Sequence, residues 1–384
     1  MYPGISDLFN DLLGTHSEIH FPPTFGTLVA ISFLFAAWTL RLELLRRERA
    51  GLLTGVDEKV LKGAPATKSE IFWNGLFGFI VGTKVGFAVF HTDEFFTNPQ
   101  SSILSLKGDF ISGLSAAAFF AWWRYREGER LRLPQPKLET VRVNPSDRIG
   151  DFTMMAALGG LAGAKVFHVL EYWDDFIADP FGMLFSGSGL TMYGGLIVGA
   201  IAVLSYANRH RIPLLQLCDA AAPGLMLAYG TGRLGCQLSG DGDWGIVNTQ
   251  PKPDWLGFLP DWSWSFTYPN NVVNEGVPMA DCAGKFCNEL PQGVFPTPLY
   301  EAVACILLFF VLWSMRKSIK VPGRMFSAYL LFNGIERFFI ELIRVNSKYQ
   351  LGGLAFTQAQ LISVLLMILG IAGWYKFRNR PLSA

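Results

Sequence analysis

An arginine within a glycine-rich stretch is the first residue of this chain whose type and setting could carry chemistry. Residues 230–245 read GTGRLGCQLSGDGDWG and follow a mostly apolar run. Arg233 is therefore expected at or near the end of a membrane helix, followed by a loop. An arginine offers a planar fork that matches phosphate oxygens, and glycines let backbone N–H groups approach a ligand. The stretch predicts either a site for an anionic lipid head group or an arginine that snorkels to the membrane surface.

A second group of ionisable residues lies within a later apolar segment. It consists of Glu336, Arg337, Glu341 and Arg344. Such groups inside a spanning segment are costly and need a partner or a task. Their spacings of four and three predict that Arg337, Glu341 and Arg344 share one helix face. If segment 325–343 runs outward, Arg337 faces a cavity near the outer leaflet, where it and Arg233 could together hold one phosphate.

The remaining polar residues in apolar segments favour structural roles. We expect Lys84, Lys165 and Asp219 to form internal pairs that fasten helices together. Gly230, Gly232 and Gly235 fit the pattern GxGxxG, but no strand precedes them, so a dinucleotide site is not predicted. The five histidines and five cysteines show no metal-ligand spacing. The sequence therefore predicts neither a cofactor nor a metal.

Apolar runs of about twenty residues are the elements that must position these groups. Hydrophobic residues make up 51% of the 384 residues, charged residues 16%, and the mean hydropathy is +0.30. Each run can cross a hydrocarbon core of ~30 Å as a helix. The predicted fold is a single all-α, polytopic membrane domain over residues 1–384. About nine spans are expected, at 25–45, 71–91, 109–124, 152–171, 190–208, 215–233, 298–315, 325–343 and 356–376.

The distribution of charge predicts the orientation of these spans. Basic runs such as RLELLRRERAGLL, RYREGERLRLPQPK and KFRNR follow the first, third and ninth segments. The loop at 172–189 holds three aspartates and no lysine or arginine. Because basic loops stay in the cytoplasm, the N-terminus is expected outside and the C-terminus in the cytoplasm. The net charge of +1 gives no reason to expect a nucleic acid partner.

The longest connection, residues 234–297, is predicted to be an outer loop. It contains Trp244, Trp255, Trp262 and Trp264, which suit a membrane–water boundary. Cys282 and Cys287 also lie in this loop. On an oxidising face they could pair, or they could remain two free thiols.

An internal repeat is visible in the first half of the chain. Residues 78–125 align without gaps on residues 159–206, at an offset of 81. The match predicts that hairpin 71–125 is an extra, parallel copy of hairpin 152–206, although convergent membrane composition is an alternative. A parallel repeat differs from the inverted repeats of transporters, so a transporter is not favoured.

Several ordered motifs resemble the prolipoprotein diacylglyceryl transferase family. They are GRLGCQLSGDGDWG at 232–245, GAKVFHVLE at 163–171, PTPLYE at 296–301 and ERFFIELIR at 336–344. The resemblance covers most of residues 150–376 and the first span. It implies a multi-pass enzyme of the bacterial cytoplasmic (inner) membrane. Its partners would be membrane lipids: phosphatidylglycerol gives its diacylglyceryl group to the lipobox cysteine in a prolipoprotein signal peptide.

The resemblance also implies roles for individual residues. Arg233 and Arg337 would bind the phosphate, with Glu341 and Arg344 orienting Arg337. The head-group pocket would be shaped by Gly240, Asp241 and Gly245. Further substrate-binding residues would be Gly194, Gly195, Tyr300 and Glu301.

Three departures from the family pattern leave the mechanism open. Tyr193 stands where the family has a histidine, and a phenol is a poor base unless its pKa is lowered. Tyr193 therefore either positions a substrate or has a structural role. Cys236 replaces the usual asparagine, and nine spans replace the usual seven. The departures at Tyr193 and Cys236 support the alternative of a non-catalytic, lipid-binding relative.

Overall fold

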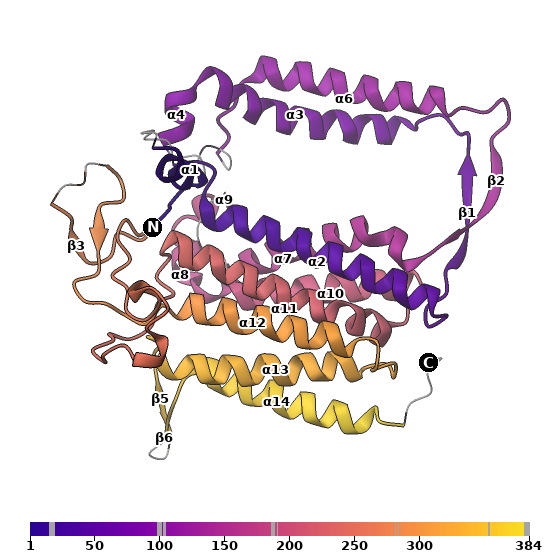
Figure 1. Ribbon diagram of the computed structural model, residues 1–384. Helices are drawn as coiled ribbons and strands as arrows, with labels where there is room; N and C mark the ends of the chain where they lie inside the picture. The colour runs from indigo at the N-terminus through magenta and orange to yellow at the C-terminus, as the bar shows by residue number, and fades with distance from the viewer. Residues whose placement is uncertain are drawn as a thin grey trace. The chain divides into compact units, whose positions relative to one another are not determined.

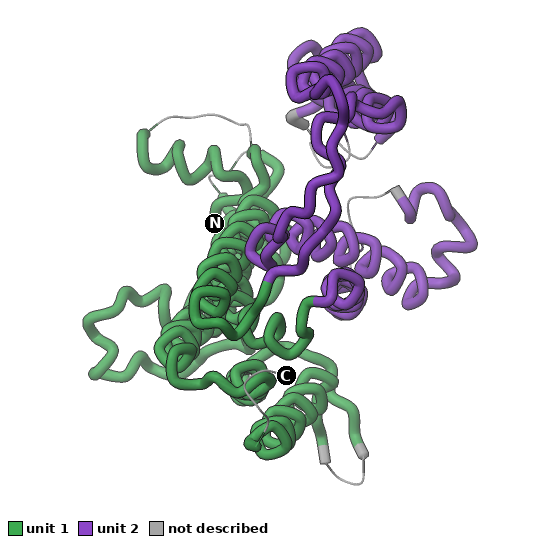
Figure 2. The backbone as a smooth tube through the Cα atoms, turned by 90° about the vertical axis from the view of Figure 1, so that its right-hand side faces the viewer, with its two compact units in different colours: residues 1–54, 212–384 green, residues 55–211 purple. Residues whose placement is uncertain are grey.

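The computed structural model consists mainly of α-helices (Figure 1). It describes residues 1–14, 20–97, 102, 105–185, 189, 191–280, 282, 284–351 and 354–379. The chain divides into two compact units, which Figure 2 shows in different colours. Unit 1 contains Met1–Thr54 and Ile212–Ala384, and unit 2 contains Gly55–Arg211. Unit 2 is thus inserted into the chain of unit 1.

Unit 1 is a bundle of long helices around an apolar core. Its helices are α1 (Ile5–Leu13), α2 (Thr24–Arg49), α11 (Leu214–Ser239), α12 (Thr297–Met315), α13 (Arg324–Ile340) and α14 (Gln358–Lys376). Helix α11 packs against α2, α12 and α13, and α13 also packs against α14. The core includes Met226, Leu312 and Met325, which are fully buried. Helix α11 is therefore the element around which this unit is assembled.

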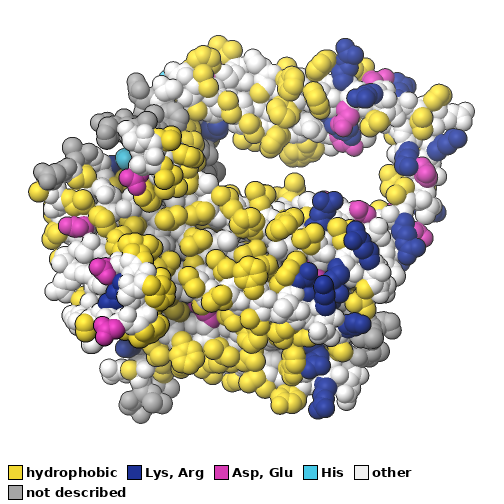
Figure 3. Space-filling model, in the orientation of Figure 1, with side chains coloured by type: hydrophobic (Ala, Val, Ile, Leu, Met, Phe, Trp, Pro, Cys, Tyr) yellow, Lys and Arg dark blue, Asp and Glu magenta, His cyan; other side chains and the backbone are white. Residues whose placement is uncertain are grey.

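Buried polar contacts join the helices at one end of unit 1. Asp219 of α11 accepts hydrogen bonds of 2.8 Å from the backbone N–H groups of Gly323 and Phe326, at the start of α13. Arg47 of α2 is buried and pairs with Glu43 at 2.9 Å. Asp219 thus has the helix-fastening role that the sequence predicts. Lysines and arginines gather at the ends of these helices, whereas hydrophobic side chains cover their flanks (Figure 3).

The opposite end of unit 1 carries the connection between α11 and α12. It contains two 3₁₀ turns, η2 (Asp254–Leu256) and η3 (Asp261–Ser263), and the pair β3 (Val277–Pro278) with β4 (Asn288–Glu289). Trp244, Tyr268, Leu290 and Val294 form a small core of its own. Cys282 and Cys287 form a disulfide, so the pairing alternative is the one observed.

After α13, the 3₁₀ turn η4 (Glu341–Ile343) and the hairpin β5 (Tyr349–Leu351) with β6 (Leu354–Phe356) lead to α14. The side chain of Thr357 accepts a hydrogen bond of 3.2 Å from the N–H of Gln360, and Gln360 bonds back to Thr357. This capping box fixes where α14 begins.

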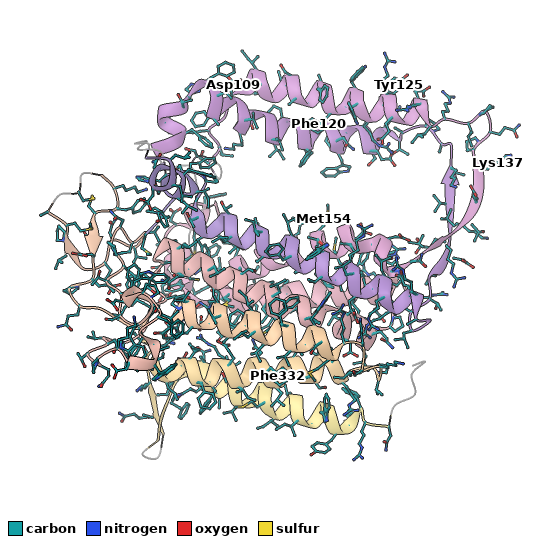
Figure 4. All side chains as sticks on the ribbon, viewed as in Figure 1. Asp109, Phe120, Tyr125, Lys137, Met154 and Phe332 are labelled. Atoms are coloured by element: carbon teal, nitrogen blue, oxygen red, sulfur yellow. A yellow bond between two sulfur atoms is a disulfide. The ribbon has the colours of Figure 1, made fainter. Side chains whose placement is uncertain are left out.

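Unit 2 contains two helical hairpins and a two-stranded ribbon. Its elements are β1 (Val56–Lys62), α3 (Lys68–Phe90), α4 (Thr92–Thr97), α6 (Phe110–Arg130), β2 (Lys137–Val143), η1 (Pro145–Arg148), α7 (Ile149–Glu171), α8 (Trp173–Ala178), α9 (Pro180–Phe185) and α10 (Met192–Arg209). Strands β1 and β2 pair antiparallel from Val56↔Val143 to Lys62↔Lys137. Across the first hairpin, Phe120 (Figure 4) packs edge-on against Phe77, with ring centroids 5.8 Å apart.

Glycines set the close approach of the helices within each hairpin. A Cβ on Gly82 of α3 would lie 2.4 Å from Cβ of Ala116 on α6. A Cβ on Gly163 of α7 would lie 2.4 Å from the carbonyl oxygen of Gly194 on α10. Both distances are too short for any larger residue, so these backbones meet only because the positions are glycine.

The two hairpins of unit 2 match in their first helices and in the short helices that follow, whereas their second helices, α6 and α10, have 21 and 18 residues. Helix α7 begins and ends 81 residues after α3, and both have 23 residues. The short helix α8 begins and ends 81 residues after α4, and both have 6 residues. In the first hairpin, Nζ of Lys84 donates to the carbonyl oxygens of Ser102 at 3.0 Å and Lys107 at 2.6 Å. Lys84 therefore has the structural role predicted for it.

Each of the nine segments predicted as spans overlaps one of these helices, although Leu190 lies outside the described residues. Among the described residues, five helical stretches are long and apolar enough to cross a membrane. They are Thr24–Arg49, Lys68–Phe90, Pro145–Glu171, Thr297–Met315 and Gln358–Lys376. Several helix ends differ from expectation, and two of these differences bear on the charged residues discussed below. Helix α11 continues to Ser239, and α13 already ends at Ile340.

Candidate functional site

A buried glutamate lies at the centre of a charged cluster in unit 1. Glu301 is in the first turns of α12 and has no exposed surface. Its Oε2 lies 2.6 Å from Nε of Arg233, which comes from α11. Its Oε1 pairs with Arg337 of α13 and lies 3.6 Å from Nη1 of Arg344. A buried charge must be compensated, so Glu301 gathers three arginines, one from α11, one from α13 and one that directly follows η4.

Asp243, in the connection after α11, is a second carboxylate shared between arginines. It bonds to Arg233, and its Oδ1 lies 2.6 Å from Nη2 of Arg344. Partial burial acts to raise the pKa of Asp243, but the charges of Arg233 and Arg344 outweigh it and leave the pKa below its usual value. Asp243 is therefore ionised at neutral pH.

The neighbouring Asp241 has a different environment. Burial, and then the negative charge of Asp243, raise the pKa of Asp241. Its Oδ1 accepts a hydrogen bond of 3.3 Å from the N–H of Asp243. Asp241 therefore supports the turn that carries Asp243, and Asp243 is the aspartate that contacts the arginines.

Two glycines determine the path of this turn. Gly240 ends α11 in the left-handed region, with φ +65°, a conformation that glycine adopts without strain. A Cβ on Gly245 would lie 2.6 Å from the carbonyl oxygen of Ile343, and the N–H of Gly245 donates to the carbonyl of Phe295 at 2.8 Å. The turn is thus held between the start of α12 and the end of α13, next to Arg344.

The end of α13 corrects one prediction. Arg337 and Glu341 do pair, at 3.1 Å. Arg344 does not share their helix face, because α13 ends at Ile340 and Arg344 has an extended backbone after η4. It contacts Asp243 and Glu301 instead. Arg344 therefore acts on Arg337 through their common partner Glu301, since no direct contact between the two arginines is among those described.

The cluster is balanced in charge but not in hydrogen bonds. Three arginines face three carboxylates, those of Asp243, Glu301 and Glu341. Among the described residues, Nε and Nη1 of Arg344 are buried and have no hydrogen-bond acceptor. Buried donors of this kind nearly always have a partner. The site therefore has N–H groups that an anion could accept from.

Other predicted residues lie elsewhere. The hydroxyl of Tyr300 donates to the carbonyl of Ser263 at 2.8 Å, so it supports the connection after α11. Tyr193 is 38% exposed at the start of α10. Gly194 and Gly195 follow it and face α7, where added Cβ atoms would lie 2.5 Å from the carbonyl oxygen of Gly163 and 3.0 Å from that of Gly160. These three residues belong to unit 2.

Two residues contact Arg233 in ways that were not predicted from the sequence. Asp243 and Asp241 both lie in the motif at 232–245. The sequence did not show which of these two aspartates contacts the arginines. The thiol of Cys236 is buried, 3.8 Å from Nη1 of Arg233. Ligand atoms of Cys236, Asp241 and Asp243 lie within 4.8 Å of one another, yet Arg233 already balances the charge of Asp243. The spacing of Arg233 and Cys236, three apart on one helix, could have predicted their contact.

Five of the described helical stretches are long and apolar enough to cross a membrane, and a charged cluster is buried at one end of the bundle. These two features define a multi-pass helical membrane protein with a site for a polar group. The sequence profile of the prolipoprotein diacylglyceryl transferases matches residues 114–376. The chain therefore belongs to that family.

Individual relatives agree with this assignment. A phosphatidylglycerol--prolipoprotein diacylglyceryl transferase of Chromohalobacter salexigens is 30% identical over 268 residues, which cover 68% of this chain and 84% of that protein. Proteins with the same name are 27% identical in Leptospira interrogans, over 56% of this chain and 75% of theirs, and 28% identical in Clostridium perfringens, over 61% and 81%. The profile match begins within α6 and ends with α14, so it includes every arginine of the cluster.

Proposed function

We propose that this protein transfers the diacylglyceryl group of phosphatidylglycerol to the thiol of the lipobox cysteine in prolipoproteins. The names of the relatives state this enzyme activity for those proteins. The observation that carries the proposal for this chain is the convergence of Arg233, Arg337 and Arg344 on Glu301. Arginine is suited to bind a phosphodiester and to stabilise the phosphate that leaves.

In the proposed reaction a C–S bond forms as the C–O bond between the diacylglycerol carbon and the phosphate breaks. Glycerol phosphate leaves with one more negative charge than the diester had, unless a proton is added. Guanidinium groups fixed in a site of low dielectric favour this increase in charge. Asp243, Glu301 and Glu341 hold the three arginines in place before the lipid arrives. Preorganised donors of this kind need no rearrangement at the moment of reaction.

We place the site at the outer face of the bacterial inner membrane. In this arrangement the nine long helices span the bilayer, the N-terminus lies outside and the C-terminus lies in the cytoplasm. Two observations support it. The basic ends of α2 and α12 meet where Arg316 lies 3.5 Å from Glu43, at the opposite end of α12 from Glu301, as the positive-inside rule requires. The disulfide Cys282–Cys287 lies in the connection on the side of Glu301, and disulfides persist in oxidising compartments.

The family resemblance assigns roles to further residues. Tyr193, Gly194 and Gly195 are proposed to contact substrate, on the family resemblance alone. Gly240, Asp241 and Gly245 would shape the head-group site by fixing the turn that carries Asp243. We also propose that hairpin α3–α6 is a duplicate of hairpin α7–α10, because α3 matches α7 and α4 matches α8 in length at an offset of 81.

Transfer to a peptide tests the function directly. Purified protein is incubated with phosphatidylglycerol and a lipobox peptide, and the peptide is weighed by mass spectrometry. We expect a gain of one diacylglyceryl group, at a rate that Arg233→Ala lowers by at least about 10²-fold. Arg132→Ala is the control, since Arg132 is exposed and pairs only loosely with Glu129, at 3.3 Å. Lipid binding without any mass gain in the wild type would favour the non-catalytic, lipid-binding alternative.

A further inference from the structure

One carboxyl group next to the charged cluster is buried without a charged partner of its own. Glu336 is in α13, directly before Arg337, and is only 6% exposed. Among the described residues, neither of its carboxyl oxygens has a nitrogen or oxygen hydrogen-bond partner. Glu301 and Glu341, in contrast, both pair with Arg337. Glu336 is therefore the acid of this region whose ionised form is not compensated by contact.

The groups around Glu336 come from each helix that packs against α13. From α12, the thiol of Cys305 lies beside it, one helical turn after Glu301. From α11, the positive charge of Arg233 interacts with the carboxyl group of Glu336. The buried hydroxyl of Tyr229, also on α11, interacts electrostatically with Glu336 as well. On α13 itself, Arg337 is adjacent. From α14, the backbone of Ser363 and the side chain of Met367 contact α13 at Gly334.

This environment determines the protonation state of Glu336 at rest. A carboxylate that is removed from water, with the weakly donating thiol of Cys305 beside it, is strongly disfavoured. The negative charge of Glu301 disfavours it further, while Arg337 and Arg233 act in the opposite direction but are already engaged by Glu301. Glu336 therefore rests as a neutral acid, with a proton close to the arginines proposed to bind the phosphate.

We propose that Glu336 is the proton donor to the phosphate oxygen that leaves. This inference rests on the proposed transferase function and assigns one further residue to it. As the C–S bond forms, the electrons of the C–O bond pass to the phosphate oxygen, which takes the proton of Glu336. The thiol proton of the peptide then restores Glu336. The net result moves the thiol proton to glycerol phosphate, so the reaction needs no other acid or base as co-reactant.

The two nearby arginines explain why the donor can lose its proton during the reaction. When Glu336 loses its proton, the positive charges of Arg337 and Arg233 favour the ionised form and offset part of the cost of burial. An acid that is neutral at rest and stabilised after proton loss is suited to general acid catalysis. Because a general acid must be protonated, the rate should fall as the pH rises past the point at which Glu336 ionises.

Glu336→Gln separates this role from a structural one, since glutamine has the shape of the neutral acid but no proton to transfer. We expect the transfer rate to fall by about 10²–10³-fold and the alkaline decrease of the wild-type rate to disappear, with binding of phosphatidylglycerol vesicles unchanged. Glu139→Gln is the control, because Glu139 is exposed on β2 and its ion pair among the described residues is with Lys62.

Wild-type activity in Glu336→Gln would overturn the proposal and leave Glu336 as a structural acid. If this variant does not fold, Glu336→Asp replaces it. If the pH at which the transfer rate falls on the alkaline side is shifted in Glu336→Asp, proton donation by this residue is supported. If that pH is unchanged, proton donation is contradicted. Absence of transfer in the wild-type protein would instead reject the transferase function itself, so the two failures are distinguishable.

Discussion

Nε of Arg233 lies 2.6 Å from Oε2 of Glu301, although the two residues come from different helices and Glu301 has no exposed surface. The same glutamate pairs with Arg337. Helices α11, α12 and α13 are therefore joined at this end by charges that are buried together. Removing either partner would leave an uncompensated charge, so substitutions here should affect both stability and chemistry.

Arg233→Ala should reduce the transfer rate by at least about 10²-fold, since loss of one preorganised donor in other enzymes costs 10²–10³. Arg233→Lys should recover only part of this loss, because lysine keeps the charge but not the planar fork. Initial rates of peptide lipidation at saturating lipid measure both variants. Near wild-type activity in Arg233→Ala would contradict the assignment of the phosphate site.

The two aspartates of the motif should respond to pH in opposite ways. The pKa of Asp243 is lowered in the folded protein, so its pairing stabilises the fold above the unfolded value of about 3.9 and is lost as the pH falls through the folded value. Asp243→Asn should cost about 1–3 kcal/mol at neutral pH and weaken the loss of stability on acidification. Thermal unfolding in detergent between pH 3 and 7 measures this.

Asp241 provides the matched comparison. Its pKa is raised in the folded protein, so its stabilising contribution is present at low pH and is lost as the pH rises through the folded value. Asp241→Asn should therefore leave stability at neutral pH unchanged or increase it. If Asp241→Asn is as damaging as Asp243→Asn, the different contacts of the two aspartates do not explain their roles.

Gly245→Ala should destabilise the turn that carries Asp243. The added Cβ would lie 2.6 Å from the backbone oxygen of Ile343, which cannot move like a flexible side chain. Overpacking of this kind costs about 1–3 kcal/mol. The control is Gly150→Ala in the first turn of α7, where nothing lies within 4 Å of the new Cβ. Equal unfolding temperatures for the two variants would show that the turn can shift freely.

The state of the cysteines tests the proposed orientation. The protein has five cysteines, of which Cys282 and Cys287 are paired and Cys218, Cys236 and Cys305 are free. Protein from intact cells, denatured without a reductant, should bind three maleimide groups, and five after reduction. Five without reduction would mean that the connection after α11 does not lie in an oxidising compartment.

The helices were largely predictable because hydrophobicity alone locates a long apolar segment. Their ends were not, since a helix stops where its last carbonyls find other partners. Residues 234–239 were expected in a loop, but the chain has no left-handed residue until Gly240 and remains helical up to it. Arg344 was expected on a helix that in fact ends at Ile340.

The arginines of the site could be predicted from the sequence. Most of the carboxylates with which they pair could not. Arg233 and Arg337 could be singled out because arginine is rare within apolar segments. The importance of Asp243 depends on the packing of Gly245 against Ile343, a contact between distant parts of the chain. The isolation of Glu336 depends on which face of α13 meets Cys305. Neither property is visible in local spacing.

The insertion of unit 2 has a consequence for the synthesis of this protein. Glu43 and Arg47 of α2 leave the ribosome early, whereas Gln216, which bonds to Arg47, follows 169 positions later. At typical translation rates this takes about 10–30 s. During that time Glu43 pairs with both Arg46 and Arg47 of the same helix, at 2.8 and 2.9 Å, and offsets one of their two positive charges. Helix α2 thus enters the bilayer with its own counterion, and can wait there until α11 has been made.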